Sequence, residues 1–104
     1  MRIAAGVLLM WAAACGGAPA PRAHTITIVD ATRFSPATLD VAVGDTVTWV
    51  NQDVVPHTAT STTGGFDSGR IDPEQSWTYT VAKAGELAYV CTYHPTMKGT
   101  LRVK

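Results

Sequence analysis

The feature that most limits how this chain can fold is a repeated alternation of polar and apolar residues. The alternation has a period of two, which is typical of a strand with one face on a core and the other in water. It recurs in six short segments: residues 25–29, 39–43, 46–50, 76–81, 87–91 and 100–104. Turn-forming pairs such as Gly44-Asp45 and Asp72-Pro73 separate the segments, and none has a helical period of useful length. The pattern therefore predicts an all-β, two-sheet antiparallel sandwich.

The length of 104 residues leaves room for one folded domain. Eight basic residues balance eight acidic ones, so nothing in the composition suggests a nucleic-acid binder, which would need a basic face. Pro36 cannot donate to a strand ladder, so Phe34-Ser35-Pro36 is expected at a sheet edge or as a crossing segment. We expect the core to contain five large strand residues: Trp49, Trp77, Tyr79, Tyr89 and Leu101.

The first 14 residues have the layout of a bacterial signal peptide. Arg2 gives a positive start, residues 3–11 are apolar, and Ala12-Ala13-Ala14 supplies small residues for cleavage. A membrane-spanning helix needs about 20 apolar residues, so this run is too short to be one. We therefore exclude residues 1–14 from the fold and expect the protein to be exported.

Cys15 follows this signal directly. Residues 12–16 resemble the lipobox of bacterial lipoproteins, which implies that Cys15 is lipidated, although Ala12 stands where that motif favours Leu. Residues 15–23 are rich in Gly, Ala and Pro and are expected to form a flexible tether. We thus expect a periplasmic or cell-surface lipoprotein whose only membrane contact is Cys15. Cleavage after Ala14 or Ala20, giving a soluble protein, is the alternative, and a disulfide between Cys15 and Cys91 is a further one.

A metal site is predicted near the end of the chain. Cys91, His94 and Met97 form a C-x-x-H-x-x-M motif between two predicted strands, and His57 follows the third strand. Taken singly, such residues are usually a buried thiol, a solvated imidazole and a core thioether. Taken together, two imidazoles, one thiolate and one weak thioether are the ligand set of a mononuclear electron-transfer copper site.

Other metal groups fit this donor set poorly. Zinc favours four strong nitrogen, sulfur or oxygen ligands, and a thioether is a weak one. An iron–sulfur cluster normally needs four cysteines and a c-type haem needs C-x-x-C-H, whereas the chain has two cysteines. Copper, as one ion cycling between Cu(I) and Cu(II), is the expected cofactor.

The motifs of residues 24–104 together resemble the plastocyanin/azurin family of cupredoxins. The short C-x-x-H-x-x-M loop is most similar to that of amicyanins, although Tyr93 and Thr96 depart from the usual loop residues. The resemblance implies a Greek-key cupredoxin fold and a blue copper site that carries single electrons. The motifs that carry it are Phe34-x-Pro36, Val43-Gly44-Asp45-x-Val47-x-Trp49-x-Asn51, His57-Thr58, Phe66-Asp67-Ser68-Gly69, Gly85 and Tyr89-x-Cys91-x-x-His94-x-x-Met97-x-Gly99-x-Leu101-x-Val103.

The resemblance also assigns roles to individual residues. It implies that His57 is buried and that His94 reaches the surface, where redox donor and acceptor proteins dock. Asn51 is implied to hydrogen-bond to the ligand loop near Cys91. His24 has no convergent partner in the sequence, and we expect it to be a solvated tail residue.

Three other functions compete with that of a monomeric electron carrier. A copper-delivery module on the same fold would have to release its ion, which a sheltered four-ligand site opposes. A copper enzyme would need a second, His-rich centre, and the chain has three histidines of which two are already used. A purely structural or adhesive sandwich leaves the four metal-binding side chains unexplained.

Overall fold

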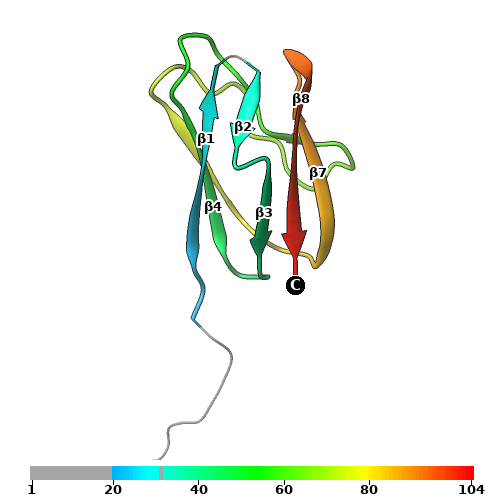
Figure 1. The fold of residues 1–104 in the computed structure, drawn as a ribbon. Coiled ribbons are helices and arrows are strands. Elements are labelled where there is room, and N and C mark those ends of the chain that lie inside the picture. The colour runs from blue at the N-terminus through cyan, green and yellow to red at the C-terminus, as the bar shows by residue number, and fades with distance from the viewer. Residues whose placement is uncertain (1–19, 31) are drawn as a thin grey trace, which may run out of the picture.

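The computed structural model describes residues 20–30 and 32–104, in which every regular element is a strand (Figure 1). The predicted signal peptide and Cys15 lie outside the described residues. Within the described part, no helix has the length and apolar character needed to cross a membrane. The strands are β1 (Ala23–Val29), β2 (Arg33–Ser35), β3 (Thr38–Val41), β4 (Thr46–Asn51), β5 (Thr60–Ser61), β6 (Ser76–Thr80), β7 (Gly85–Cys91) and β8 (His94–Val103).

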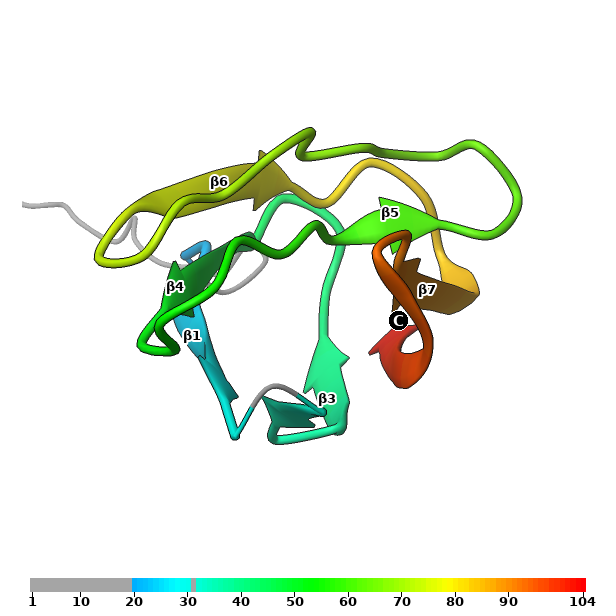
Figure 2. The same ribbon diagram turned by 90° about the horizontal axis from the view of Figure 1, so that it is seen from above.

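The strands form two four-stranded sheets, so the predicted all-β sandwich is confirmed. The first sheet has the order β2-β1-β4-β6 and the second the order β3-β8-β7-β5. Each sheet is mixed rather than purely antiparallel, because β1 pairs parallel with β4 and β3 pairs parallel with β8. β1 and β4 are parallel because the chain crosses to the second sheet as β3 after β2, and returns to the first sheet only at β4. Figure 2 shows the chain between β5 and β6 crossing back from the second sheet to the first.

Strand boundaries agree with the alternation except at three places. β2 is an edge strand of the first sheet, as Pro36 predicted, and the two-residue β5 went unrecognised because two residues cannot establish a period. β8 begins at His94 rather than near Thr100. The predicted metal loop is therefore mostly strand.

The core lies between the sheets and contains the expected aromatic residues. Trp49, Tyr89 and Leu101 are fully buried, while Trp77 and Tyr79 are half-buried against the same cluster. Gly99 packs flat on the Tyr89 ring, where an added Cβ would lie 2.2 Å from Cζ of Tyr89. A side chain at position 99 would therefore displace a fully buried ring two residues before Cys91.

The sandwich has two distinct ends. β4 and β7 finish and β8 begins at one end, which we call the site pole, and it contains Asn51, Cys91 and His94. β1 begins beside the start of β4 and the end of β8 lies beside the start of β7, so these segments meet at the opposite end, the N-terminal pole. Figure 1 shows the chain entering β1 and leaving β8 at this second end.

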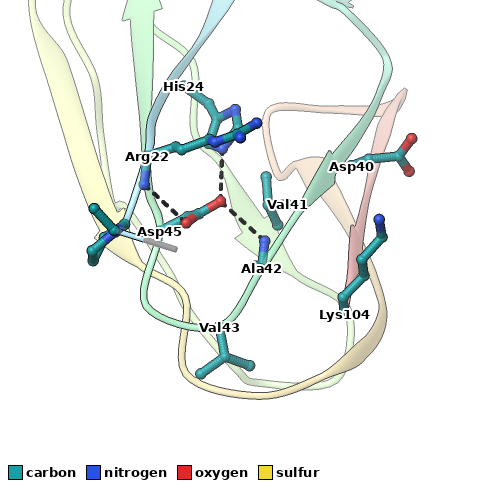
Figure 3. A pocket seen from close by; sticks show the side chains of 10 residues that line it. Arg22, His24, Asp40, Val41, Ala42, Val43, Asp45 and Lys104 are labelled. Carbon is teal, nitrogen blue, oxygen red and sulfur yellow. Dashed lines mark hydrogen bonds and ion pairs between the residues drawn. The ribbon is translucent and has the colours of Figure 1, made fainter. Parts of the chain in front are cut away.

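His24 is not the solvated tail residue that we expected. It lies within β1, and its Nε2 is 2.8 Å from Oδ2 of Asp45, with 19% of the His24 side chain exposed (Figure 3). Asp45 also accepts hydrogen bonds from the backbone N–H groups of Arg22 and Ala42, each at 3.0 Å. Asp45 therefore links the start of β1 to the turn between β3 and β4 through hydrogen bonds. The His24–Asp45 contact could not be predicted from the sequence, because Gly44-Asp45 indicates only a turn.

The hydrogen bonds to Asp45 lower its pKa from 3.8 to about 2, with the Arg22 N–H contributing most, followed by His24 and then Ala42. Because the folded pKa lies below the unfolded one, ionised Asp45 stabilises the fold above pH 3.8, and this contribution is lost as the pH falls towards 2. We expect Asp45→Asn to lower the free energy of unfolding at neutral pH and to flatten its pH dependence over that acid range. Urea unfolding at several pH values measures both effects. An unchanged acid profile in the variant would contradict this role of Asp45.

Candidate metal centre

Three of the four predicted ligands converge at the site pole. His57 Nδ1 lies 3.6 Å from Cys91 Sγ, and Cys91 Sγ lies 3.7 Å from His94 Nδ1. The three donor atoms all lie within 4.8 Å of one another, although His57 and Cys91 are 34 residues apart. His57 and Cys91 are fully buried and His94 is half-buried, as the resemblance implied.

The connection between β7 and β8 is shorter than the predicted loop between strands, because β8 begins at His94 rather than near Thr100. Thr92 and Tyr93 alone join β7 to β8, and Cys91 pairs directly with His94 across the turn. The next pair is Val90 with Lys98, so the register shifts and residues 95–97 bulge out of the ladder. Bulges of this kind redirect side chains and are common beside functional sites. Met97 ends this bulge with 1% of its surface exposed, so its thioether is a buried group on the strand that begins at His94.

Asn51 anchors the segment that carries His57. Its Nδ2 donates to the carbonyl oxygens of Val55 at 2.8 Å and Ile71 at 3.0 Å, and its Oδ1 accepts from the N–H of Asp53 at 2.9 Å. The amide thus joins the loop after β4 to the segment between β5 and β6, rather than making the expected bond to the Cys91 loop. Backbone hydrogen bonds between His57 and Ile71 fix the same segment from the other side.

Thr58 makes the link between the two ligand segments that we had assigned to Asn51. Its backbone N–H points at Cys91 Sγ at 3.3 Å, and its Oγ1 accepts from the N–H of Thr92 at 2.9 Å. The two threonine hydroxyl oxygens lie 3.1 Å apart in a further hydrogen bond. An N–H donated to sulfur favours the thiolate that binds a metal. The sequence signal for this role is only that Thr58 adjoins His57.

Asp53 orients the buried imidazole, a role that the sequence analysis missed. The outer nitrogen of His57, Nε2, lies 2.8 Å from Oδ2 of Asp53. Donation of an Nε2–H to this carboxylate leaves Nδ1, which faces Cys91, with a free lone pair. The available signal was an acidic residue four positions before a ligand histidine in the same loop.

The donor set and its surroundings fit one copper ion. Two imidazole nitrogens and a buried thiolate are preorganised around one point, with a buried thioether on the following bulge. Soft thiolate and thioether ligands with imidazoles favour copper, and three strong ligands with one weak one are typical of electron-transfer sites. The carboxylate on the far side of His57 is the usual outer partner of a metal-binding histidine.

The importance of Asp53 is open to a direct test. We expect Asp53→Ala to weaken copper binding by roughly 10- to 100-fold, because His57 loses the partner that fixes its ring and its tautomer. Asp53→Asn keeps an oxygen acceptor for Nε2–H and should lose less affinity. Competition titration with a copper chelator measures both variants against the parent chain. Equal affinity of the parent and Asp53→Ala would contradict the role of this carboxylate.

Comparison with known proteins agrees with the fold. The sequence model of the cupredoxin-like domain family matches residues 2–103, so this chain belongs to the cupredoxin-like family. Among its relatives, it resembles amicyanins: it is 34% identical over 77 residues to the amicyanin of Paracoccus denitrificans, an alignment that covers 69% of this chain. The aligned part spans 59% of the length of that amicyanin.

Solved structures give the same result. An oxidised amicyanin variant superposes with a TM-score of 0.72 at 32% identity, covering 79% of this chain and 82% of that one. A purple cupredoxin from Nitrosopumilus maritimus superposes with a TM-score of 0.68 at 29% identity, covering 77% of this chain and 98% of that one. The cupredoxin fold is therefore confirmed, together with the similarity to amicyanins.

Proposed function

We propose that this protein is a one-electron carrier that holds a single copper ion with His57, Cys91, His94 and Met97. The observation that carries the proposal is the convergence of three donor atoms within 4.8 Å, two of them on fully buried residues. Copper supplies reversible one-electron chemistry when bound in such a site. The surrounding chain holds the ligands in place: Asp53 orients His57, and Thr58 joins the two ligand segments. Little rearrangement is then needed when the charge at the site changes.

Electrons enter and leave through the half-buried edge of His94 in this proposal. Tyr93 beside it is 49% exposed, and Pro95 and Thr96 are also exposed, which gives an uncharged rim for a redox partner. Without residues 1–14, which include Arg2, seven basic residues stand against eight acidic ones, so long-range steering is weak and docking of donor and acceptor proteins depends mainly on apolar contact. The monomer carries the complete site.

A carrier is favoured over the alternative, a copper-delivery module on the same fold, by the burial of His57 and Cys91. An ion held by fully buried donors leaves slowly. A copper enzyme would need a second, His-rich copper centre. Of the three histidines, only His24 is left for it, and His24 is paired with Asp45 at the N-terminal pole. Comparing the rate of copper transfer to a chelating acceptor with the rate of electron transfer to a soluble redox partner separates the carrier from the delivery module.

Copper reconstitution tests the proposal. We expect Cu(II) to give an intense visible band and a thiolate-copper EPR signal, because Cys91 supplies the sulfur. Cys91→Ala should lose both signals, while Cys15→Ser, the matched control at the second cysteine, should keep them. A parent chain that stays colourless with Cu(II), or a Cys91→Ala variant that keeps the band, would contradict the assignment.

We further propose that the protein is a periplasmic or cell-surface lipoprotein, with residues 1–14 removed, Cys15 lipidated and the stretch from Cys15 to the start of β1 as the tether; β1 begins at Ala23, one residue before the predicted domain boundary. The sequence around Cys15 supports this, and so does the entry of β1 at the pole opposite the ligands. An anchor there would leave His94 facing partners rather than the membrane.

Fractionation of cells tests the anchor. We expect the parent chain in the membrane fraction and Cys15→Ser in the soluble exported fraction, because a diacylated cysteine supplies two acyl chains, enough for firm anchoring. Cys91→Ala, which changes the other cysteine, should remain with the membrane. Retention of Cys15→Ser in the membrane fraction would exclude the lipidated cysteine as the anchor.

A further inference from the structure

A row of aromatic rings crosses the core from the strand of Cys91 to the far edge of the first sheet. Tyr89 lies on β7 two residues before Cys91, and its ring meets Trp49 of β4 edge-to-face with centroids 5.3 Å apart. Trp49 is paired across the sheet with Trp77 of β6, with ring centroids 5.7 Å apart. Trp77 in turn stacks on Tyr79 at 6.2 Å with an interplanar angle of 9°.

Phe66 packs alongside this row and closes the gaps between its members. Its ring lies 5.5 Å from Trp49, 4.6 Å from Tyr79 and 5.9 Å from Tyr89, measured between centroids. All of these separations are within the range of direct ring contact. Electronic coupling falls steeply with the gap between rings, so a series of contacts carries an electron much faster than one long step through aliphatic side chains.

The two ends of the row differ in their exposure to solvent. Trp49 and Tyr89 are fully buried, whereas Trp77 and Tyr79 are half-buried on β6, an edge strand. Small oxidants in solution can therefore reach the β6 end, while the other end adjoins buried Cys91. β6 belongs to the sheet that does not contain His94, so this end is separate from the rim around Tyr93.

The polar atoms of the buried rings suit them to pass an electron on. Neither Trp49 Nε1 nor the Tyr89 hydroxyl oxygen has a hydrogen-bond partner among the described residues. An oxidised indole normally relaxes by giving its N–H proton to an acceptor. Among the described residues Trp49 Nε1 has no well-aligned acceptor for that proton, so an oxidised Trp49 is expected to keep it until an electron arrives.

We propose that this row is a second electron path, through which the reduced copper site repairs Trp77 and Tyr79 after attack by one-electron radical oxidants. This inference rests on the copper site proposed above. Trp77 gives one electron to the oxidant and its indole proton to water. The Trp77 radical then takes one electron, passed along Tyr89 and Trp49 from Cu(I) held by Cys91, and regains a proton. The net change is one reduced oxidant and one Cu(I) converted to Cu(II).

The direction of flow follows from oxidising strength. Indole and phenol radicals are far stronger oxidants than a thiolate-bound Cu(II), so electrons move along the row only towards an oxidised ring. Ordinary redox partners do not oxidise tryptophan, and they exchange electrons at His94 instead. The two paths therefore serve different reaction partners.

Pulse radiolysis with the azide radical, a one-electron oxidant of tryptophan, tests the proposal. All variants are studied without residues 1–14, which include Trp11, so that Trp49 and Trp77 are the two tryptophans present. In the reduced, copper-loaded protein we expect the indole radical absorbance to decay while the blue band appears with the same first-order rate constant, independent of protein concentration. In the copper-free protein the radical should persist and decay by second-order recombination. The blue band recorded before reduction confirms that copper is bound.

Two variants locate the path. Trp49→Phe should slow the coupled decay by about an order of magnitude, and Trp77→Phe should sharply lower the initial yield of indole radical. Phe34→Leu is the matched control, because Phe34 is fully buried and contacts Tyr89 at 4.7 Å but lies off the row. It should keep the parent rate. Equal radical lifetimes with and without copper, an unchanged rate in Trp49→Phe, or a blue band that forms directly with loss of azide radical would overturn the proposal.

Discussion

One buried sulfur atom organises the site pole. Cys91 Sγ lies within 3.7 Å of an imidazole nitrogen from each of two chain segments and receives the N–H of Thr58 at 3.3 Å. A thiolate in a fully buried position is costly unless charge and hydrogen bonds compensate it; the Thr58 N–H supplies one hydrogen bond, and a cation held between the sulfur and the two imidazole nitrogens would supply the charge. The β4–β5 loop brings His57 and Thr58 to this sulfur atom, and the β7–β8 turn brings His94 to it.

The rest of the fold holds these two segments at a fixed separation. Asn51 closes the loop that carries His57, and the bulge at residues 95–97 gives β8 room to turn beside Cys91. Below them, the fully buried Trp49 and Tyr89 rings fill the space between the sheets, and Gly99 lets Tyr89 pack directly on β8. At the opposite pole Asp45 fastens β1 to the β3–β4 turn. The fold around the ligands therefore holds them in place, so that little has to move when the charge at the site changes.

The sequence was informative where chemistry depends on residue type and spacing. Alternation gave the main strands, and the C-x-x-H-x-x-M motif with His57 gave the donor set, because few other combinations suit a soft ion. It was uninformative where function depends on how loops fold. Asp53, Thr58 and the pairing of His24 with Asp45 are ordinary polar residues until the backbone brings them together. The early start of β8 at His94, and the register shift that follows it, also depend on pairing between strands, which no local pattern encodes.

The central claim is that Cys91, His57 and His94 bind one copper ion together. X-ray absorption spectroscopy at the copper edge of the loaded protein tests it most directly. The account predicts one short copper–sulfur bond and two copper–nitrogen bonds of imidazole type, in both oxidation states and with little change in length between them. Coordination by nitrogen and oxygen alone, without a short bond to sulfur, would contradict it.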